Sequence, residues 1–132
     1  MPDINCIIVD NNRESCRRME ELLSKIPHIH VIESVYEADE AVYEIVKHKP
    51  NIVFMEIEMP GMSGFEIAKA VRLQHTWPRF IVVTEHEQYA IKALRNAAFD
   101  YLVKPVDIEE LKEAVDRTIN NTSNNQPMKE EA

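Results

Sequence analysis

The sequence contains very little glycine. Its 132 residues include only two glycines, Gly61 and Gly64, and both lie in one four-residue stretch. A glycine-rich phosphate loop normally follows the first strand of a nucleotide-binding domain, but residues 10–13 contain no glycine. The sequence therefore argues against dinucleotide and P-loop sites. Glycine permits a left-handed backbone and the close approach of other groups. We therefore expect the loop that contains both glycines to have a defined backbone shape.

Cysteine is scarce, and positive charge is outweighed by negative charge. Cys6 lies in an apolar run and Cys16 in a helical pattern, without metal-ligand spacing, so we expect buried thiols in a reducing cytoplasm. The net charge of −8 argues against binding to nucleic acid or to an anionic membrane surface. The histidines are scattered, and no two share metal-ligand spacing on one helix face. We expect all five to be surface residues: His28, His30, His48, His75 and His86.

Long apolar runs are absent too. No run approaches the roughly 20 residues that span a bilayer, and no signal peptide pattern opens the chain. With 45% hydrophobic and 29% charged residues, the composition is typical of a globular domain. We assign residues 1–121 to one domain. The segment 122–132 consists mostly of polar residues and ends in Lys-Glu-Glu-Ala, and it is expected to be a disordered tail or a truncated linker to an output domain.

Short apolar runs alternate with helical patterns five times. The predicted strands are 4–9, 30–35, 52–55, 80–83 and 99–103, and helical patterns follow over 12–26, 38–46, 64–77, 88–96 and 107–119. This alternation predicts an α/β fold, a single doubly wound five-stranded parallel sheet with helices on both faces. In the flavodoxin-like order 2-1-3-4-5, ligands bind beyond the carboxyl ends of the strands, where strands 1 and 3 diverge.

Four of the five predicted strands end on polar side chains that could reach this crevice: Asp10 with Asn11, Glu56, Thr84 and Lys104. Carboxylate and carbonyl oxygens suit Mg²⁺. A hydroxyl and an ammonium can donate to a phosphoryl group or a carboxylate, and a carboxylate can itself become an acyl phosphate. The simplest alternative is that Glu56 is a solvated acid at the end of a strand.

Over residues 3–119 the chain resembles the receiver domain of two-component response regulators. The resemblance lies in Ile-Ile-Val-Asp10 followed by Asn11, and in the segments 55–64, 82–84 and 100–105, in that order and spacing. The segment 89–94, Tyr-Ala-Ile-Lys-Ala-Leu, is similar to receivers attached to LytTR-type DNA-binding output domains.

The resemblance implies roles for individual residues. In the family, an acidic pair after the first strand binds Mg²⁺, and an aspartate after the third accepts phosphate from a histidine kinase. Asp10 matches the first acid of the pair, and the backbone carbonyl of Glu58 is implied as a further metal ligand. Thr84 and Lys104 match the residues that contact the phosphoryl oxygens. Tyr101 matches the aromatic side chain that swings inward together with the threonine as a switch.

Two positions depart from the family pattern. Glu56 stands at the position of the phospho-accepting aspartate, and Asn11 stands at that of the second acid. The extra methylene of glutamate moves the carboxylate by about 1.5 Å, and a misplacement near 1 Å can cost roughly 10²-fold in rate. Mg²⁺ requires near-ideal octahedral geometry, so we expect its site to be weakened or lost. We also expect Glu56 to pair with Lys104 or Thr84 and partly imitate the phosphorylated state.

The function predicted is therefore a signalling module in the cytoplasm, not an enzyme beyond self-phosphorylation at most. It would act through protein contacts, including a homodimer through its fourth helix, fifth strand and fifth helix. An attached output domain would serve transcription regulation. One alternative is an active receiver that a histidine kinase or phosphotransfer protein phosphorylates on Glu56 with Mg²⁺. A small Mg²⁺-dependent phosphatase-like enzyme is less favoured, because the sequence offers no candidate catalytic His or Cys at the strand ends and no insertion that would cover a substrate.

Overall fold

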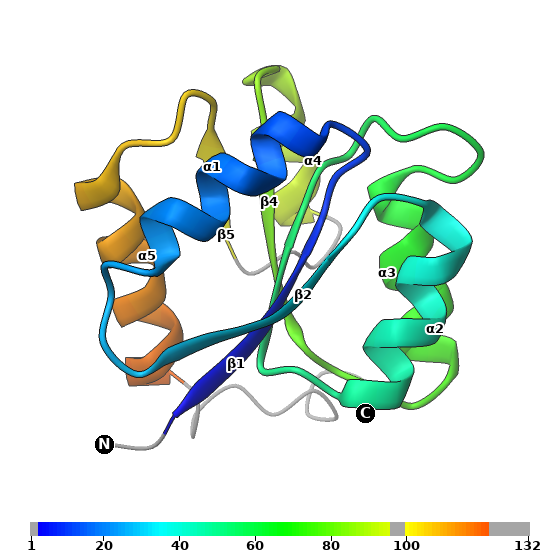
Figure 1. Ribbon diagram of the computed structural model, residues 1–132. Coiled ribbons are helices and arrows are strands. Elements are labelled where there is room, and N and C mark those ends of the chain that lie inside the picture. The colour runs from blue at the N-terminus through cyan, green and yellow to red at the C-terminus, as the bar shows by residue number, and fades with distance from the viewer. Residues whose placement is uncertain (1–2, 96–99, 122–132) are drawn as a thin grey trace.

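The strands form one parallel sheet in the predicted order. The computed structural model describes residues 3–95 and 100–121. The strands are β1 (Ile4–Val9), β2 (Ile29–Val35), β3 (Ile52–Met55), β4 (Arg79–Thr84) and β5 (Asp100–Val103). They pair in parallel in the order β2-β1-β3-β4-β5 (Figure 1). This is the doubly wound arrangement that the alternating pattern predicts.

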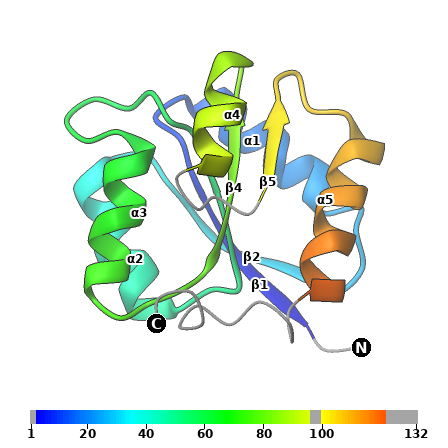
Figure 2. The same ribbon diagram turned by 180° about the vertical axis from the view of Figure 1, so that it is seen from behind.

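Helices cover both faces of the sheet. They are α1 (Arg13–Leu23), α2 (Ala38–His48), α3 (Gly64–Leu73), α4 (Gln88–Arg95) and α5 (Ile108–Asn121). Helices α1 and α5 lie on one face and α2 and α3 on the other (Figure 2), while α4 contacts β4 and β5. In the described part of the chain, no helix combines the length and the apolar character needed to cross a membrane.

Some boundaries differ from those expected. Helix α1 ends at Leu23, with Ser24 as its C-cap, three residues before the predicted end at Ile26. Ile26 precedes Pro27, and a residue before proline is disfavoured in the helical region. Ile26 still packs against the core, which explains its helical spacing. The predicted end of the fourth helix at 96 and the predicted start of the fifth strand at 99 lie outside the described residues.

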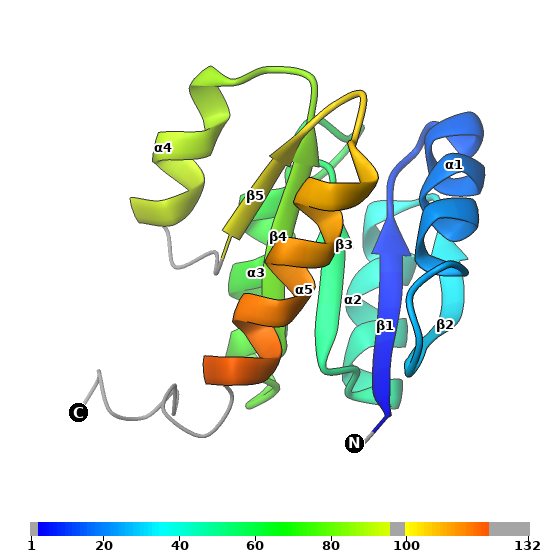
Figure 3. The same cartoon turned by 90° about the vertical axis from the view of Figure 1, so that its left-hand side faces the viewer.

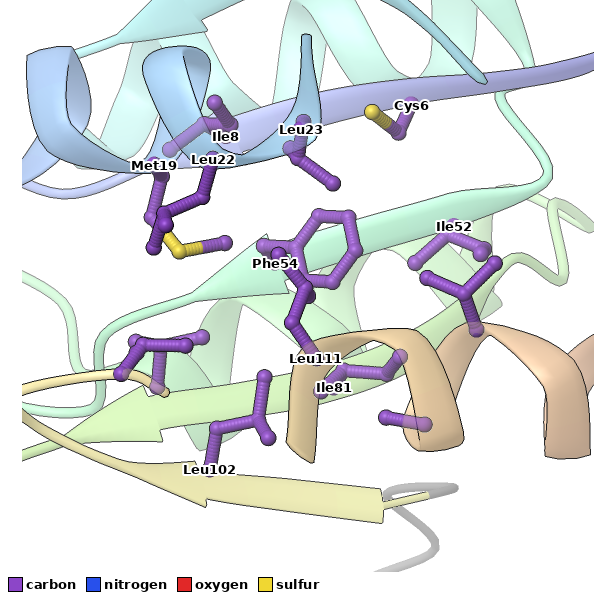
Figure 4. Close-up of a cluster of buried hydrophobic side chains, with 14 of the residues drawn as sticks. Cys6, Ile8, Met19, Leu22, Leu23, Ile52, Phe54, Ile81, Leu102 and Leu111 are labelled. Carbon is purple, nitrogen blue, oxygen red and sulfur yellow. The ribbon is translucent and has the colours of Figure 1, made fainter. Parts of the chain in front are cut away.

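The core consists of two layers separated by the sheet. Cys6, Ile8 and Phe54 face α1 and α5 (Figure 4), whereas the intervening residues Ile7 and Val9 face α2 and α3. Burying a large apolar side chain contributes about 1.5–3 kcal/mol, so strands that are apolar on both faces stabilise both layers. The cysteines are both buried and free, as expected. Burial raises the pKa of Cys6 to about 12.

Strand β2 contains a bulge at Ile32, which the sequence did not predict. Val31 pairs with Cys6, but Glu33 pairs with Ile7, so the register shifts by one residue. In a regular strand, successive side chains alternate between faces. Here Ile32 packs in the layer of α2 and α3, and Glu33 also turns toward α2. The hydroxyl of Ser34 points to the other face and donates to Glu20 of α1 at 2.5 Å.

The loop between β3 and α3 depends on both glycines, as expected. Gly61 has a φ of +87°, a left-handed conformation that strains other residues. At Gly64 an added Cβ would lie only 2.6 Å from the backbone oxygen of Glu56. Ser63 caps α3 by accepting the Glu66 N–H at 3.2 Å, while the Glu66 carboxylate accepts the Ser63 N–H at 2.8 Å. This capping box and the close contact at Gly64 together hold the backbone around Glu56.

Candidate functional site

The carboxyl ends of four strands bring the predicted polar residues to one rim, at the top of the sheet in Figure 3. The Glu56 N–H donates to the Val9 carbonyl at 2.9 Å, and the Lys104 N–H donates to the Thr84 carbonyl at 2.8 Å. These bonds extend the strand ladders as far as the candidate site residues Glu56 and Lys104. Asp10, Glu56 and Thr84 are buried, and the Lys104 side chain is 17% exposed.

One ammonium group joins the two buried acids. Lys104 Nζ lies 2.8 Å from Asp10 Oδ2 and 3.0 Å from Glu56 Oε1. Desolvation of Lys104 opposes its charge, but its hydrogen bonds to Asp10 and Glu56 outweigh that effect and raise the pKa of Lys104. The Lys104-Pro105 peptide bond that follows is cis. The ammonium therefore bridges one oxygen of Asp10 and one oxygen of Glu56 and compensates their charge.

Backbone donors engage the remaining carboxylate oxygens. Asp10 Oδ1 accepts the Asn12 N–H at 2.9 Å. Glu56 Oε2 accepts the Ile57 N–H at 2.8 Å and the Glu58 N–H at 3.1 Å. With 7% of Glu56 exposed, its carboxylate is held inside the rim and is not a solvated acid at the end of a strand.

Thr84 and Tyr101 lie beside this cluster without contacting the Glu56 carboxylate through any hydrogen bond found in the described residues. The Thr84 hydroxyl accepts the His86 N–H at 3.3 Å. Tyr101 is half-buried and packs against Ile57 and Val82. Of the two partners expected for Glu56, Lys104 is therefore the one that binds it.

The donors for a metal ion are present only in part. The carboxylates of Asp10 and Glu56 and the backbone carbonyl of Glu58 are hard oxygen ligands, which fit Mg²⁺ in kind. Asn11 is exposed and lines a neighbouring hollow of about 590 Å³ with Glu58 and Tyr89. A Mg²⁺ ion bound here would share the Asp10 and Glu56 carboxylates with the Lys104 ammonium.

The Glu58 side chain makes a bridge that sequence reasoning missed. Tyr89 donates its hydroxyl proton to Glu58 Oε2 at 2.7 Å, which raises the pKa of Tyr89. His86 Nε2 lies 3.2 Å from Glu58 Oε1. Glu58 lies two residues after Glu56, and His86 lies two residues after Thr84 on the neighbouring strand. This shared spacing could have indicated the pairing. The bridge ties the loop after β3 to the start of α4.

Comparison with known sequences identifies relatives of the same kind. Residues 6–116 match the model of the response regulator receiver domain. The chain is 38% identical over 114 residues to an uncharacterized response regulatory protein of Shewanella oneidensis, covering 86% of this chain and 48% of that protein. It is 30% identical over 108 residues to the sensory transduction protein LytT of Bacillus anthracis, covering 82% and 44%. The chain thus spans about half the length of the curated relatives it matches.

Solved structures agree with this relationship. The response regulator domain of Thermotoga maritima CheB matches with a TM-score of 0.80 at 26% identity, covering 89% of this chain and 97% of that chain. A LuxR-family DNA-binding response regulator of Staphylococcus aureus matches with a TM-score of 0.78 at 28% identity, covering 87% and 98%. The chain therefore belongs to the response regulator receiver domain family of two-component signalling, as its motifs predicted.

Proposed function

We propose that this receiver domain signals without depending on a phosphoryl group, with Glu56 at the phospho-acceptor position partly imitating the phosphorylated state. The observation that supports this is the fixed position of the Glu56 carboxylate. One oxygen lies 3.0 Å from Lys104 Nζ, and the other accepts two backbone N–H groups. A phosphoryl group at this rim would use the same kinds of donor.

The imitation is partial for two reasons. A carboxylate carries one charge and two oxygens, whereas a phosphoryl group carries nearly two charges and three oxygens. In addition, no hydrogen bond in the described part of the chain joins the Thr84 hydroxyl to Glu56; that hydroxyl accepts the His86 N–H instead. We infer that Glu56 biases the Thr84 and Tyr101 switch toward the active arrangement only through its contact with Lys104.

The same contacts disfavour phosphorylation of Glu56. To attack phosphorus, the carboxylate must present a lone pair. Oε2 already accepts two backbone N–H groups, so the attack would have to come from Oε1 while Lys104 holds that oxygen in place. A bound Mg²⁺ would neutralise charge on a transferred phosphoryl group. Asp10, Glu56 and the Glu58 carbonyl would hold the ion beside the Lys104 ammonium, without a second acid at Asn11. We propose that the rim binds Mg²⁺ only weakly. We also propose that the domain has no catalytic activity beyond self-phosphorylation at most.

The first test is a titration with Mg²⁺ and beryllium fluoride, a mimic of the acyl phosphate, followed through the amide NMR signals of Thr84, Tyr101 and Lys104. We expect no saturable shift in the native domain. The matched variant Glu56→Asp shortens the side chain by one methylene and should gain a response that needs both ligands. A saturable response of the native domain to both ligands together would show that the pocket still works, and would favour the alternative, a receiver phosphorylated by a histidine kinase on Glu56.

A second variant tests the imitation itself. Glu56→Gln keeps the length of the side chain but removes the charge that faces Lys104. We expect the amide signals of Thr84 and Tyr101 to move, because the bias through the contact with Lys104 is lost. If only the signals next to residue 56 move, Glu56 does not imitate a phosphoryl group.

We further propose that the domain works in the cytoplasm as part of a longer protein. Two observations support this: the relatives are about twice as long as the matched region, and one is named the transcriptional regulatory protein BtsR of Salmonella typhi. The partners would be a histidine kinase or phosphotransfer protein, an output domain, and a second copy bound through α4, β5 and α5.

A further inference from the structure

A second polar cluster lies away from the rim, between the edge strand β2 and helix α2. It consists of Glu33 on β2 and of Glu44 and His48 on α2. One ligand atom from each side chain lies within 4.8 Å of the other two. His48 Nε2 is 3.1 Å from Glu44 Oε1 and 3.7 Å from Glu33 Oε2. In a tetrahedral zinc site with bonds near 2.0 Å, neighbouring ligand atoms are roughly 3.3 Å apart.

The bulge in β2 creates this cluster. Without the register shift at Ile32, Glu33 would point to the opposite face of the sheet, toward α1. Bulges commonly redirect a side chain in this way. Glu44 and His48 are four residues apart on α2 and so lie on the same side of the helix. The cluster therefore depends on a local backbone feature and on helical spacing together.

One oxygen in the cluster lacks a donor. Glu33 Oε2 is buried and receives no hydrogen bond from any group in the described part of the chain. A buried acceptor without a partner is costly, and more so when it carries charge. Desolvation and the neighbouring Glu44 carboxylate raise the pKa of Glu33. A cation between the three side chains would satisfy the oxygen and offset the repulsion between the carboxylates.

We propose that Glu33, Glu44 and His48 form a binding site for a divalent transition-metal ion, with Zn²⁺ as the best fit. Two carboxylates and an imidazole match the ligands of zinc sites, whereas the imidazole disfavours Mg²⁺ and Ca²⁺. The side chains of Glu33, Glu44 and His48 are 35%, 24% and 33% exposed. This partial exposure leaves a path for the ion and room for a water molecule as fourth ligand.

The test is a calorimetric titration of the domain with Zn²⁺ in excess Mg²⁺, so that Mg²⁺ competes at the oxygen ligands of the rim. We expect one zinc ion per chain. Glu33→Gln and His48→Gln should each weaken binding by about tenfold or more, by the scale of such losses at metal sites. Co²⁺ should give a visible absorption spectrum that both variants lose.

The matched control is His30→Gln. His30 and His28 face Asp3, at 3.2 Å and 3.7 Å, and so offer another histidine-acid cluster for adventitious zinc. We expect His30→Gln to leave zinc affinity unchanged. Absence of zinc binding, or loss of binding in His30→Gln but not in His48→Gln, would overturn the proposal. Circular dichroism without zinc establishes that each variant is folded, and Glu44→Gln replaces any variant that is not.

Discussion

At the residue scale, the rim depends on one lysine that serves two acids. Asp10 and Glu56 are 5% and 7% exposed, and Lys104 contacts both. Removing one partner of a buried ion pair costs more than the pair contributes, because a charge is left without compensation. Here the loss of one side chain would leave two carboxylates without their cation.

We expect Lys104→Met to lower the free energy of unfolding by about 3 kcal/mol at neutral pH. Urea denaturation measures this loss. The control is Lys112→Met on the exposed side of α5, which should change the value by less than about 0.5 kcal/mol. Equal small effects of both variants would contradict the central role of the ammonium.

On the alkaline side, the contribution of Lys104 should disappear as the pH passes its folded pKa. Its folded pKa lies above the ordinary value of 10.5, so the folded state holds the proton more tightly than the unfolded state does. The stabilisation is therefore complete below pH 10.5 and is lost as pH rises through the higher folded pKa. The difference in unfolding free energy between the native domain and Lys104→Met should stay constant from pH 7 to 9 and shrink above pH 10.5.

The sequence identified the rim residues but not their pairing. Asp10, Glu56, Thr84 and Lys104 each follow an apolar strand, and parallel strands place such positions at one edge. Whether Glu56 contacts Lys104 or Thr84 depends on differences of an ångström, which residue types do not determine. Glu58 was expected to act through its backbone, and its bond to Tyr89 depends on where α4 begins relative to the loop after β3.

At the element scale, the two glycines of the β3-α3 loop have different tasks. Gly61 supplies a backbone conformation in open space, because a Cβ at this position would have no atom within 4 Å. Gly64 supplies room, because a Cβ would meet backbone atoms of Glu56 and Ile57 at 2.6 Å and 3.1 Å. An alanine substitution therefore tests the left-handed backbone conformation at Gly61 and the close contact with the backbone of Glu56 at Gly64.

We expect Gly64→Ala to destabilise the domain by about 2 kcal/mol through overpacking and to shift the amide signals of Glu56 and Lys104. Gly61→Ala should cost about 1 kcal/mol from its left-handed conformation and leave those signals in place. Urea denaturation and amide NMR of both variants measure the two effects. Identical spectra at Glu56 in both variants would show that Gly64 does not position the site.

The sequence predicted the elements better than their irregularities. Each strand is a short apolar run, and each helix has an inner stripe, so order and type follow from periodicity. The bulge at Ile32 could not be predicted because β2 has apolar residues on both faces, so a shift by one residue leaves a similar pattern. The end of α1 was misplaced because Ile26 contacts the core from a turn and therefore resembles one more helical position.

At the scale of the whole molecule, charge should govern self-association. A hollow of about 430 Å³ on the proposed dimer face is lined by Asp100, Tyr101, Glu113 and Arg117 among others, and Arg117 Nε contacts Asp100 Oδ2 at 2.7 Å. The chain as a whole carries a net charge of −8. Two copies therefore repel one another at low salt. Near 0.1 M salt the Debye screening length falls to about 10 Å, and the repulsion weakens.

We expect sedimentation equilibrium to show a dimer that strengthens from 50 to 500 mM salt, two concentrations chosen on either side of about 0.1 M. Glu113→Lys on α5 should alter the dimer constant, because it changes charge on the proposed face. Glu21→Lys makes the same change on the exposed side of α1 and should have little effect. Equal effects of the two variants would indicate general charge repulsion and no specific dimer face.

The two buried cysteines can be used as probes of local unfolding. Cys6 lies in the inner strand β1, whereas Cys16 lies on α1 and donates its Sγ–H to the Asp10 carbonyl at 3.4 Å. Because only the thiolate reacts, and burial raises the pKa of Cys16 to about 11, alkylating reagents modify either residue only after the surrounding structure has opened. The alkylation rate of Cys16 then measures how often α1 detaches next to Asp10, and that of Cys6 measures how often the layer of α1 and α5 opens from the sheet.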